Sequence, residues 1–112
     1  MQKLELTWIG KGKEPAVEPR ILLHDSSKDY GNSNLGNMLI HGDNLLALKA
    51  LEQEYTGRIK CIYIDPPYNN RNKSWKYNND FVDINDSYIH SKWMSLMATR
   101  LTLAKKLLNP SN

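Results

Sequence analysis

An apolar run that ends at two consecutive prolines constrains this chain more than any other feature of its sequence. Residues 59–64 are almost all apolar, and Asp65-Pro66-Pro67-Tyr68 follows them directly. Such a run is typical of a strand that is buried on both faces of a parallel sheet. Neither proline can donate a backbone N–H, so the hydrogen-bonded ladder must end there. The run therefore predicts a central strand of an α/β domain, with an acidic residue at its carboxyl end.

The segments on either side of this run alternate between strand and helix patterns. Residues 38–41 are a short apolar run, and Gly42-Asp43-Asn44 after them is typical of a helix start, with Asp43 or Asn44 as N-cap. The predicted helix ends at Gly57, a residue suited to a left-handed cap. A second, long amphipathic helix is expected from about residue 86 to residue 108. This order predicts a strand-helix-strand-helix half of a Rossmann-like, mostly parallel sheet.

The first 37 residues have a different character. Leu4, Leu6 and Trp8 alternate with polar residues, which predicts a short strand. Residues 14–37 then carry two prolines, two glycines and many serines and asparagines, a density of turn formers that opposes long elements. We therefore divide the chain into residues 1–37, an N-terminal strand and irregular arm with a further short strand expected near 21–23, and residues 38–112, the α/β part.

Composition excludes several classes of protein. With 112 residues, 40% hydrophobic and 24% charged, the chain resembles one ordinary globular domain and no disordered, collagen-like or coiled-coil protein. Fifteen basic against twelve acidic residues give a net charge of +3, which permits phosphate contacts without requiring them. One cysteine, Cys61, and three scattered histidines indicate neither a disulfide nor a metal site. Without a signal peptide or an apolar span, we expect no membrane contact and a cytoplasmic location.

The tetrapeptide Asp65-Pro66-Pro67-Tyr68 suits chemistry on an exocyclic amino group. Such an amino group is a poor nucleophile, because its lone pair is delocalised into the ring. Two acceptors in the ring plane, the Asp65 carboxylate and the Pro66 carbonyl, would hold both N–H groups and favour attack on a methyl cation equivalent. The proline rings fix φ and aim these acceptors, and Tyr68 would stack on the base. Taken alone, the same tetrapeptide also fits a rigid turn.

Several stretches of this chain together resemble one family. Asp65-Pro66-Pro67-Tyr68-Asn69 is similar to the catalytic motif of S-adenosylmethionine-dependent amino-methyltransferases. The resemblance extends over nearly the whole chain, with matching stretches at Leu6–Lys11, Glu18–Leu22, Asn37–Leu48, Lys60–Ile64, Tyr77–Phe81 and His90–Trp93. Together they resemble the N-terminal part of the modification subunit of type III restriction-modification systems, a DNA methyltransferase of the permuted class in which Asp-Pro-Pro-Tyr comes first.

This resemblance implies an adenine-N6 DNA methyltransferase, with S-adenosylmethionine as methyl donor and no metal. It implies a bacterial, cytoplasmic protein that acts on double-stranded DNA with a flipped adenine. It also implies a homodimer that pairs with an ATP-dependent restriction subunit. The fold implied is a partial Rossmann-like methyltransferase fold, with residues 38–112 as the incomplete N-terminal part of the catalytic domain.

The resemblance also assigns roles to single residues. The catalytic residues would be Asp65, Pro66, Pro67 and Tyr68, with Asp65 and Pro66 on the amino group and Tyr68 against the adenine. Asp43 would lie near the adenosine of the cofactor, although the sequence itself favours a helix N-cap at this position, and the two roles are compatible. The loop beyond the motif mixes basic and aromatic side chains, which fits DNA contacts and a solvated loop about equally. Its candidate DNA-binding residues are Asn69, Arg71, Lys73, Trp75 and Lys76.

Two departures from the family pattern stand out. Relatives continue the motif as Asn-Thr-Gly, whereas this chain has Asn69-Asn70-Arg71. The F-x-G-x-G turn that approaches the cofactor does not occur in these residues, and in the permuted order it lies downstream. We therefore expect an N-terminal piece of a larger enzyme. The alternative is a catalytically silent fragment, or a nucleic-acid-binding remnant without a cofactor pocket. An RNA or protein-glutamine methyltransferase is disfavoured, because its glycine-rich turn precedes Pro-Pro-Tyr.

Overall fold

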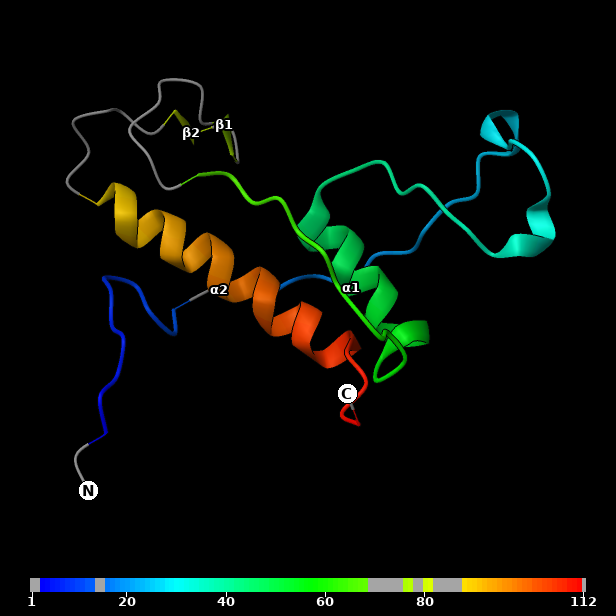
Figure 1. Ribbon diagram of the computed structural model, residues 1–112. Helices are drawn as coiled ribbons and strands as arrows, with labels where there is room; N and C mark the ends of the chain where they lie inside the picture. Colours follow the sequence, from blue (N-terminus) through cyan, green and yellow to red (C-terminus); the bar gives the residue numbers. More distant parts are fainter. Residues whose placement is uncertain (1–2, 14–15, 69–75, 78–79, 82–87, 112) are drawn as a thin grey trace.

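Two α-helices dominate the computed structural model of this chain, which describes residues 3–13, 16–68, 76–77, 80–81 and 88–111 (Figure 1). The helices are α1, Asn44–Tyr55, and α2, Ile89–Leu107. Two short 3-10 helices, η1 (Ser26–Lys28) and η2 (Ser33–Leu35), precede them. A two-stranded antiparallel pair, β1 (Lys76–Tyr77) with β2 (Asp80–Phe81), lies between them in the chain and aligns Lys76 with Phe81.

Helix α1 begins and ends where the sequence predicts. Asp43 is the N-cap, and its side chain accepts hydrogen bonds from the backbone N–H groups of Leu45 and Leu46, at 2.9 and 3.2 Å. These bonds satisfy two of the amides that a helix start otherwise leaves without partners. Beyond the last turn, Gly57 has a φ of +69°, a left-handed conformation that side-chain-bearing residues rarely adopt. The predicted cap at each end is thus confirmed.

Helix α2 carries the buried side chains of the described residues. Met97, Leu103, Ala104 and Leu107 lie on one stripe at helical spacing, and each is less than a tenth exposed. Arg100 lies on the same stripe and is also buried. The last turn carries Lys105 and Lys106, whose positive charges are favourable near the negative end of the helix dipole. This stripe faces α1, so the core of the described structure is the contact between the two helices.

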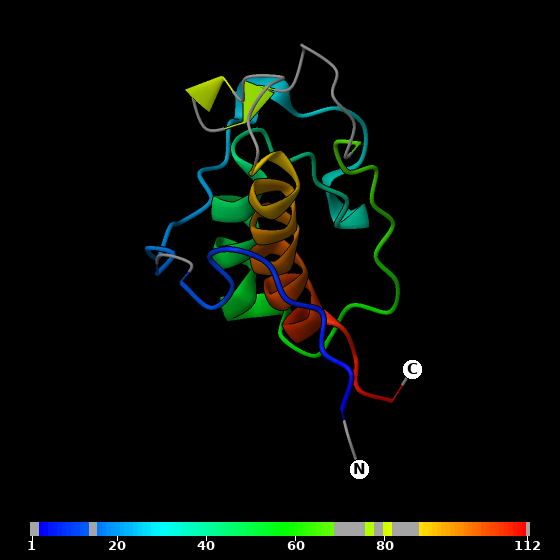
Figure 2. The same ribbon diagram turned by 90° about the vertical axis from the view of Figure 1, so that its left-hand side faces the viewer.

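The two helices run in the same direction, and α1 is linked to α2 near each of its own two ends. The Arg100 Nε donates to the Asn44 side-chain oxygen at 2.6 Å, where α1 begins. Near its other end, Glu52 pairs with Lys106 at 2.7 Å. Both views show α1 beside the second half of α2 (Figures 1 and 2).

The predicted Rossmann-like sheet is wrong for the described residues. None of the segments expected to be strands, 4–8, 21–23, 38–41 and 59–64, forms one. Only Ile59 makes a bridge, with Leu108: its N–H donates to the Leu107 carbonyl, and its own carbonyl accepts from Asn109 N–H. Leu39 is 97% exposed and Tyr63 is 93% exposed. A strand exists only through hydrogen bonds to a neighbouring backbone, and apolar periodicity by itself does not supply that neighbour.

The N-terminal residues contact α2 rather than pairing as a strand. The indole N–H of Trp8 donates to the Ser95 hydroxyl at 2.9 Å, and the backbone N–H of Ile9 donates to the Ser91 hydroxyl at 3.3 Å. Ser91 and Ser95 are one helical turn apart and therefore lie on the same side of α2. The segment with η1 and η2 instead projects away from α2 (Figure 1). Each of its short helices is capped by a side chain, that of Asp25 or Asn32.

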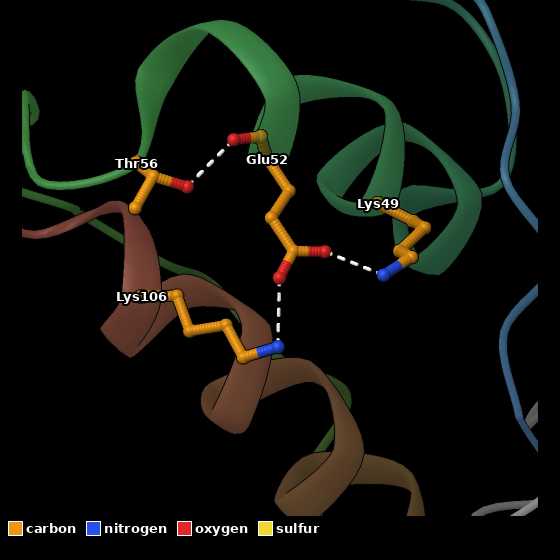
Figure 3. Close-up of polar contacts among 4 residues, drawn as sticks. All are labelled: Lys49, Glu52, Thr56 and Lys106. Carbon is orange, nitrogen blue, oxygen red and sulfur yellow. Dashed lines mark hydrogen bonds and ion pairs between the residues drawn. The ribbon is translucent and has the colours of Figure 1, made fainter.

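A carboxylate bridges α1 and α2 between two lysines. Glu52 on α1 accepts from Lys49 at 2.6 Å and from Lys106 on α2 at 2.7 Å (Figure 3). The Glu52 side chain is only 21% exposed, so solvent screens these pairs less than at an open surface. The hydrogen bonds from Lys106 and then Lys49 hold the pKa of Glu52 below its ordinary value of 4.5. The bridge is therefore a charged link between the helices near the end of α1.

We expect Glu52→Gln to lower the stability of the chain at pH 7 by about 0.5–1 kcal/mol, because glutamine loses both ion pairs. The pKa of Glu52 is lower in the folded than in the unfolded chain, so its contribution is complete above pH 4.5 and is lost as the pH falls through the folded pKa. Urea unfolding midpoints at neutral and acidic pH test this. Glu54→Gln, at an exposed position on α1, is the matched control. A deficit that persists unchanged at low pH would contradict the electrostatic explanation.

Candidate functional site

The predicted catalytic segment, Asp65 to Tyr68, lies at the surface beside α2. Asp65 is exposed, Tyr68 is 76% exposed, and Pro66 and Pro67 are half-buried. The indole N–H of Trp93 donates to the carbonyl of Pro67 at 2.6 Å. The segment is therefore tied to α2 through its backbone, while the carboxylate and the phenol remain open to a ligand.

The segment runs along α2 in the opposite direction to the helix. Ile59 contacts the end of α2 at Leu107 and Leu108, and Pro67 contacts Trp93 near its start. Extended chain from 59 to 67 spans about 26 Å, and α2 from 93 to 107 spans about 21 Å. Nearly extended chain is therefore needed to join the two contacts. Figure 2 shows this segment passing on one side of α2, with α1 on the other.

Asp43, the predicted cofactor residue, is first of all a helix cap. One of its carboxylate oxygens accepts both N-terminal amides of α1, and the other lies 3.8 Å from an Nη atom of Arg100. The side chain is 38% exposed. Its predicted N-cap role is confirmed, whereas its contact with a cofactor stays a prediction.

Arg100 is a site residue that the sequence analysis missed. It lies on α2, and its guanidinium reaches the turn before α1, with Nε bonded to Asn44 and Nη1 bonded to the Leu96 carbonyl at 3.2 Å. Its position three residues after Met97 and four before Ala104 places it on the buried stripe, and that spacing was the available signal. Trp93 was expected on this apolar face, but its hydrogen bond to Pro67 was not. A largely buried indole needs an acceptor for its N–H, and nothing in the sequence says which one.

The candidate DNA-binding residues largely lie outside the described residues. Lys76 is in β1, where the structure describes the backbone alone. The others outside the description are Asn69, Arg71, Lys73 and Trp75. Their predicted contacts with DNA stay predictions.

Two general features of the described part of the chain bear on its chemistry. No cluster of three or more His, Cys, Asp or Glu side chains that could hold a metal ion occurs among the described residues. Neither described α-helix combines the length and apolar character that crossing a membrane requires.

We expect Asp43→Ala to destabilise the chain by about 1 kcal/mol, because two amides of α1 lose their acceptor. Asp43→Asn keeps an acceptor oxygen and should cost clearly less. Thermal unfolding followed by far-ultraviolet circular dichroism distinguishes the two. If both substitutions cost the same, the charge facing Arg100, rather than the cap, would be what stabilises this turn.

Relatives of this chain include modification subunits and a methyltransferase. The probable type III restriction-modification enzyme HindVI Mod subunit of Haemophilus influenzae is 46% identical over 72 residues, which cover 64% of this chain and 9% of that protein. The StyLTI Mod subunit of Salmonella typhimurium is 35% identical over a gapped alignment of 131 positions, which covers 93% of this chain and 20% of that protein. The type II methyltransferase M.KpnI of Klebsiella pneumoniae is 40% identical over 68 residues, covering 60% and 16%.

The chain thus spans between 9% and 20% of the length of these three relatives. No family model matches it. No solved structure matches it either. The homologues to which this chain is similar are therefore Mod subunits of type III restriction-modification enzymes and a type II methyltransferase.

Proposed function

We propose that this chain is part of a site-specific DNA methyltransferase that transfers a methyl group from S-adenosylmethionine to N6 of adenine in a restriction-modification system. The observation that carries the proposal is the similarity to a Mod subunit that is 35% identical and matches 93% of the chain. The surface position of Asp65 and Tyr68 adds support, because a flipped base must reach both side chains. Because the chain spans a small share of these relatives, the activity belongs to the whole protein.

In this proposal the Asp65–Tyr68 segment binds and orients the target adenine. The Asp65 carboxylate and the Pro66 carbonyl accept the two amino N–H groups, and Tyr68 stacks on the ring. Held in this way, the amino nitrogen directs its lone pair out of the ring plane. A bound S-adenosylmethionine would supply the methyl group to this nitrogen and leave as the neutral thioether, and the amino group would lose one proton to water. No covalent bond to the protein is needed.

S-adenosylmethionine, when bound, supplies a methyl group activated by its sulfonium charge. Among the described residues, Asp43 fits the adenosine part of this cofactor. One oxygen of its carboxylate is engaged by α1, while the other lies beyond hydrogen-bond distance of Arg100. That second oxygen is chemically suited to accept from a hydroxyl or amino group.

The remaining proposals concern the whole protein. Residues 38–112 would belong to the catalytic domain, with residues 1–37 as the arm before it. Asn69, Arg71, Lys73, Trp75 and Lys76 would contact double-stranded DNA beside the flipped adenine. The protein would be a cytoplasmic homodimer that pairs with an ATP-dependent restriction subunit.

The second candidate is a catalytically silent fragment or a nucleic-acid-binding remnant that lacks a cofactor pocket. Calorimetry of the 112-residue chain with S-adenosylmethionine separates the two. Saturable binding would exclude a remnant without a cofactor site.

We expect Asp65→Ala in the full-length gene product to lower the methyl-transfer rate by about 10²–10³-fold, because the amino group loses a charged acceptor in the transition state. Affinity for DNA should change little, because phosphate contacts elsewhere dominate it. Methyl transfer from labelled donor and filter binding to DNA measure the two quantities. Glu54→Ala, on the exposed part of α1, is the control. Parallel loss of transfer and of DNA affinity would remove Asp65 from this role.

A further inference from the structure

We propose that Trp93 is a positioning residue, which fixes the peptide plane that carries the nitrogen and Cα of Tyr68 by holding the Pro67 carbonyl against α2. This inference rests on the proposed function, in which Tyr68 contacts the target base. Trp93 touches no substrate in this account and acts only through the backbone of the Asp65–Tyr68 segment.

Pro67 has two backbone dihedrals, φ and ψ, that decide how the chain enters Tyr68. Its ring fixes φ near −65°, so only ψ remains free. The hydrogen bond from Trp93 holds the carbonyl oxygen of Pro67, and that oxygen turns with ψ. The same peptide plane contains the nitrogen and Cα of Tyr68, because the peptide bond is planar. Together, the proline ring and the hydrogen bond from Trp93 fix φ and ψ of Pro67, and with them the peptide plane between Pro67 and Tyr68.

The donor is itself held on a rigid element. Trp93 lies near the start of α2, which continues without interruption to Leu107. Seven residues further along, Arg100 bonds to Asn44 and lies near Asp43. Seven residues are two helical turns, so the two side chains leave α2 in nearly the same direction, about 10 Å apart along the axis. From there Trp93 reaches the segment on one flank of the helix, and Arg100 reaches α1 on the other (Figure 2). One helix therefore holds both the target-base segment and the turn assigned to the cofactor, at a spacing set by its rise.

The chain offers a matched comparison for this bond. Trp8 also donates its indole N–H to α2, at 2.9 Å to the Ser95 hydroxyl, but it joins the N-terminal arm to the helix. Phenylalanine at either position keeps an aromatic ring and removes the N–H. Trp93→Phe and Trp8→Phe therefore differ in which segment is released from α2, and not in the chemistry that is lost.

The experiment compares both variants with the unsubstituted full-length protein. Steady-state methyl transfer gives kcat and the KM for DNA, and nuclear magnetic relaxation of ¹⁵N-labelled tyrosine gives the order parameter of the Tyr68 amide, which reports how freely its peptide plane moves. We expect Trp93→Phe to lower kcat by about 10-fold to 100-fold, since small displacements of a reacting group are costly. The order parameter at Tyr68 should fall, while the KM for DNA and the thermal midpoint stay at the values of Trp8→Phe. Trp8→Phe should keep the unsubstituted kcat.

Two results would overturn the inference: equal kcat values in the two variants, or a Tyr68 amide whose order parameter does not respond to Trp93→Phe. The failure of the proposed function would look different. An unsubstituted protein without methyl transfer would refute that function alone, and the order parameter, which requires no turnover, would still decide whether Trp93 holds the segment.

Discussion

The contact between α1 and α2 is the interaction on which the rest of the described structure depends. Its apolar part is the stripe of Met97, Leu103, Ala104 and Leu107, and burying such side chains contributes most of what holds two helices together. Its polar part lies at the two ends, where Arg100 reaches Asn44 and Lys106 reaches Glu52. These charged links fix which turns of the helices meet, because a purely apolar stripe tolerates sliding more readily than a set of directional bonds.

Helix α2 is also the surface on which the extended parts of the chain are placed. The N-terminal arm reaches it through Trp8, and the candidate catalytic segment reaches it through Ile59 at one end and Pro67 at the other. Between those two contacts the chain is nearly extended and its side chains are largely exposed. Two fixed ends are enough to position an extended segment whose prolines already restrict its backbone. Because the segment is attached to α2 at these two points, the side chains of Asp65 and Tyr68 stay exposed to solvent.

Prediction from the sequence succeeded for the helices and failed for the sheet, for one physical reason. A helix satisfies its backbone hydrogen bonds within its own segment, so the Asp43 cap, the apolar spacing and the Gly57 end are local signals that decide it. A strand satisfies its bonds with another segment. Residues 59–64 have the composition of a buried strand, yet only Ile59 has a backbone partner in the described structure. The apolar pattern indicated burial and could not indicate a neighbour.

For the candidate site, the chemical groups can be identified from the sequence without a structure. They are a carboxylate, two prolines and an aromatic ring in one tetrapeptide, and an acidic cap at the start of a helix. Tertiary structure alone decided how these groups are held. Trp93 lies 26 residues beyond Pro67, and Arg100 lies 56 residues beyond Asn44, so no local pattern connects either pair. Each bond exists because the packing of α2 brings a donor to an acceptor, a part-buried indole in one case and a buried guanidinium in the other, and burial makes a donor without an acceptor costly.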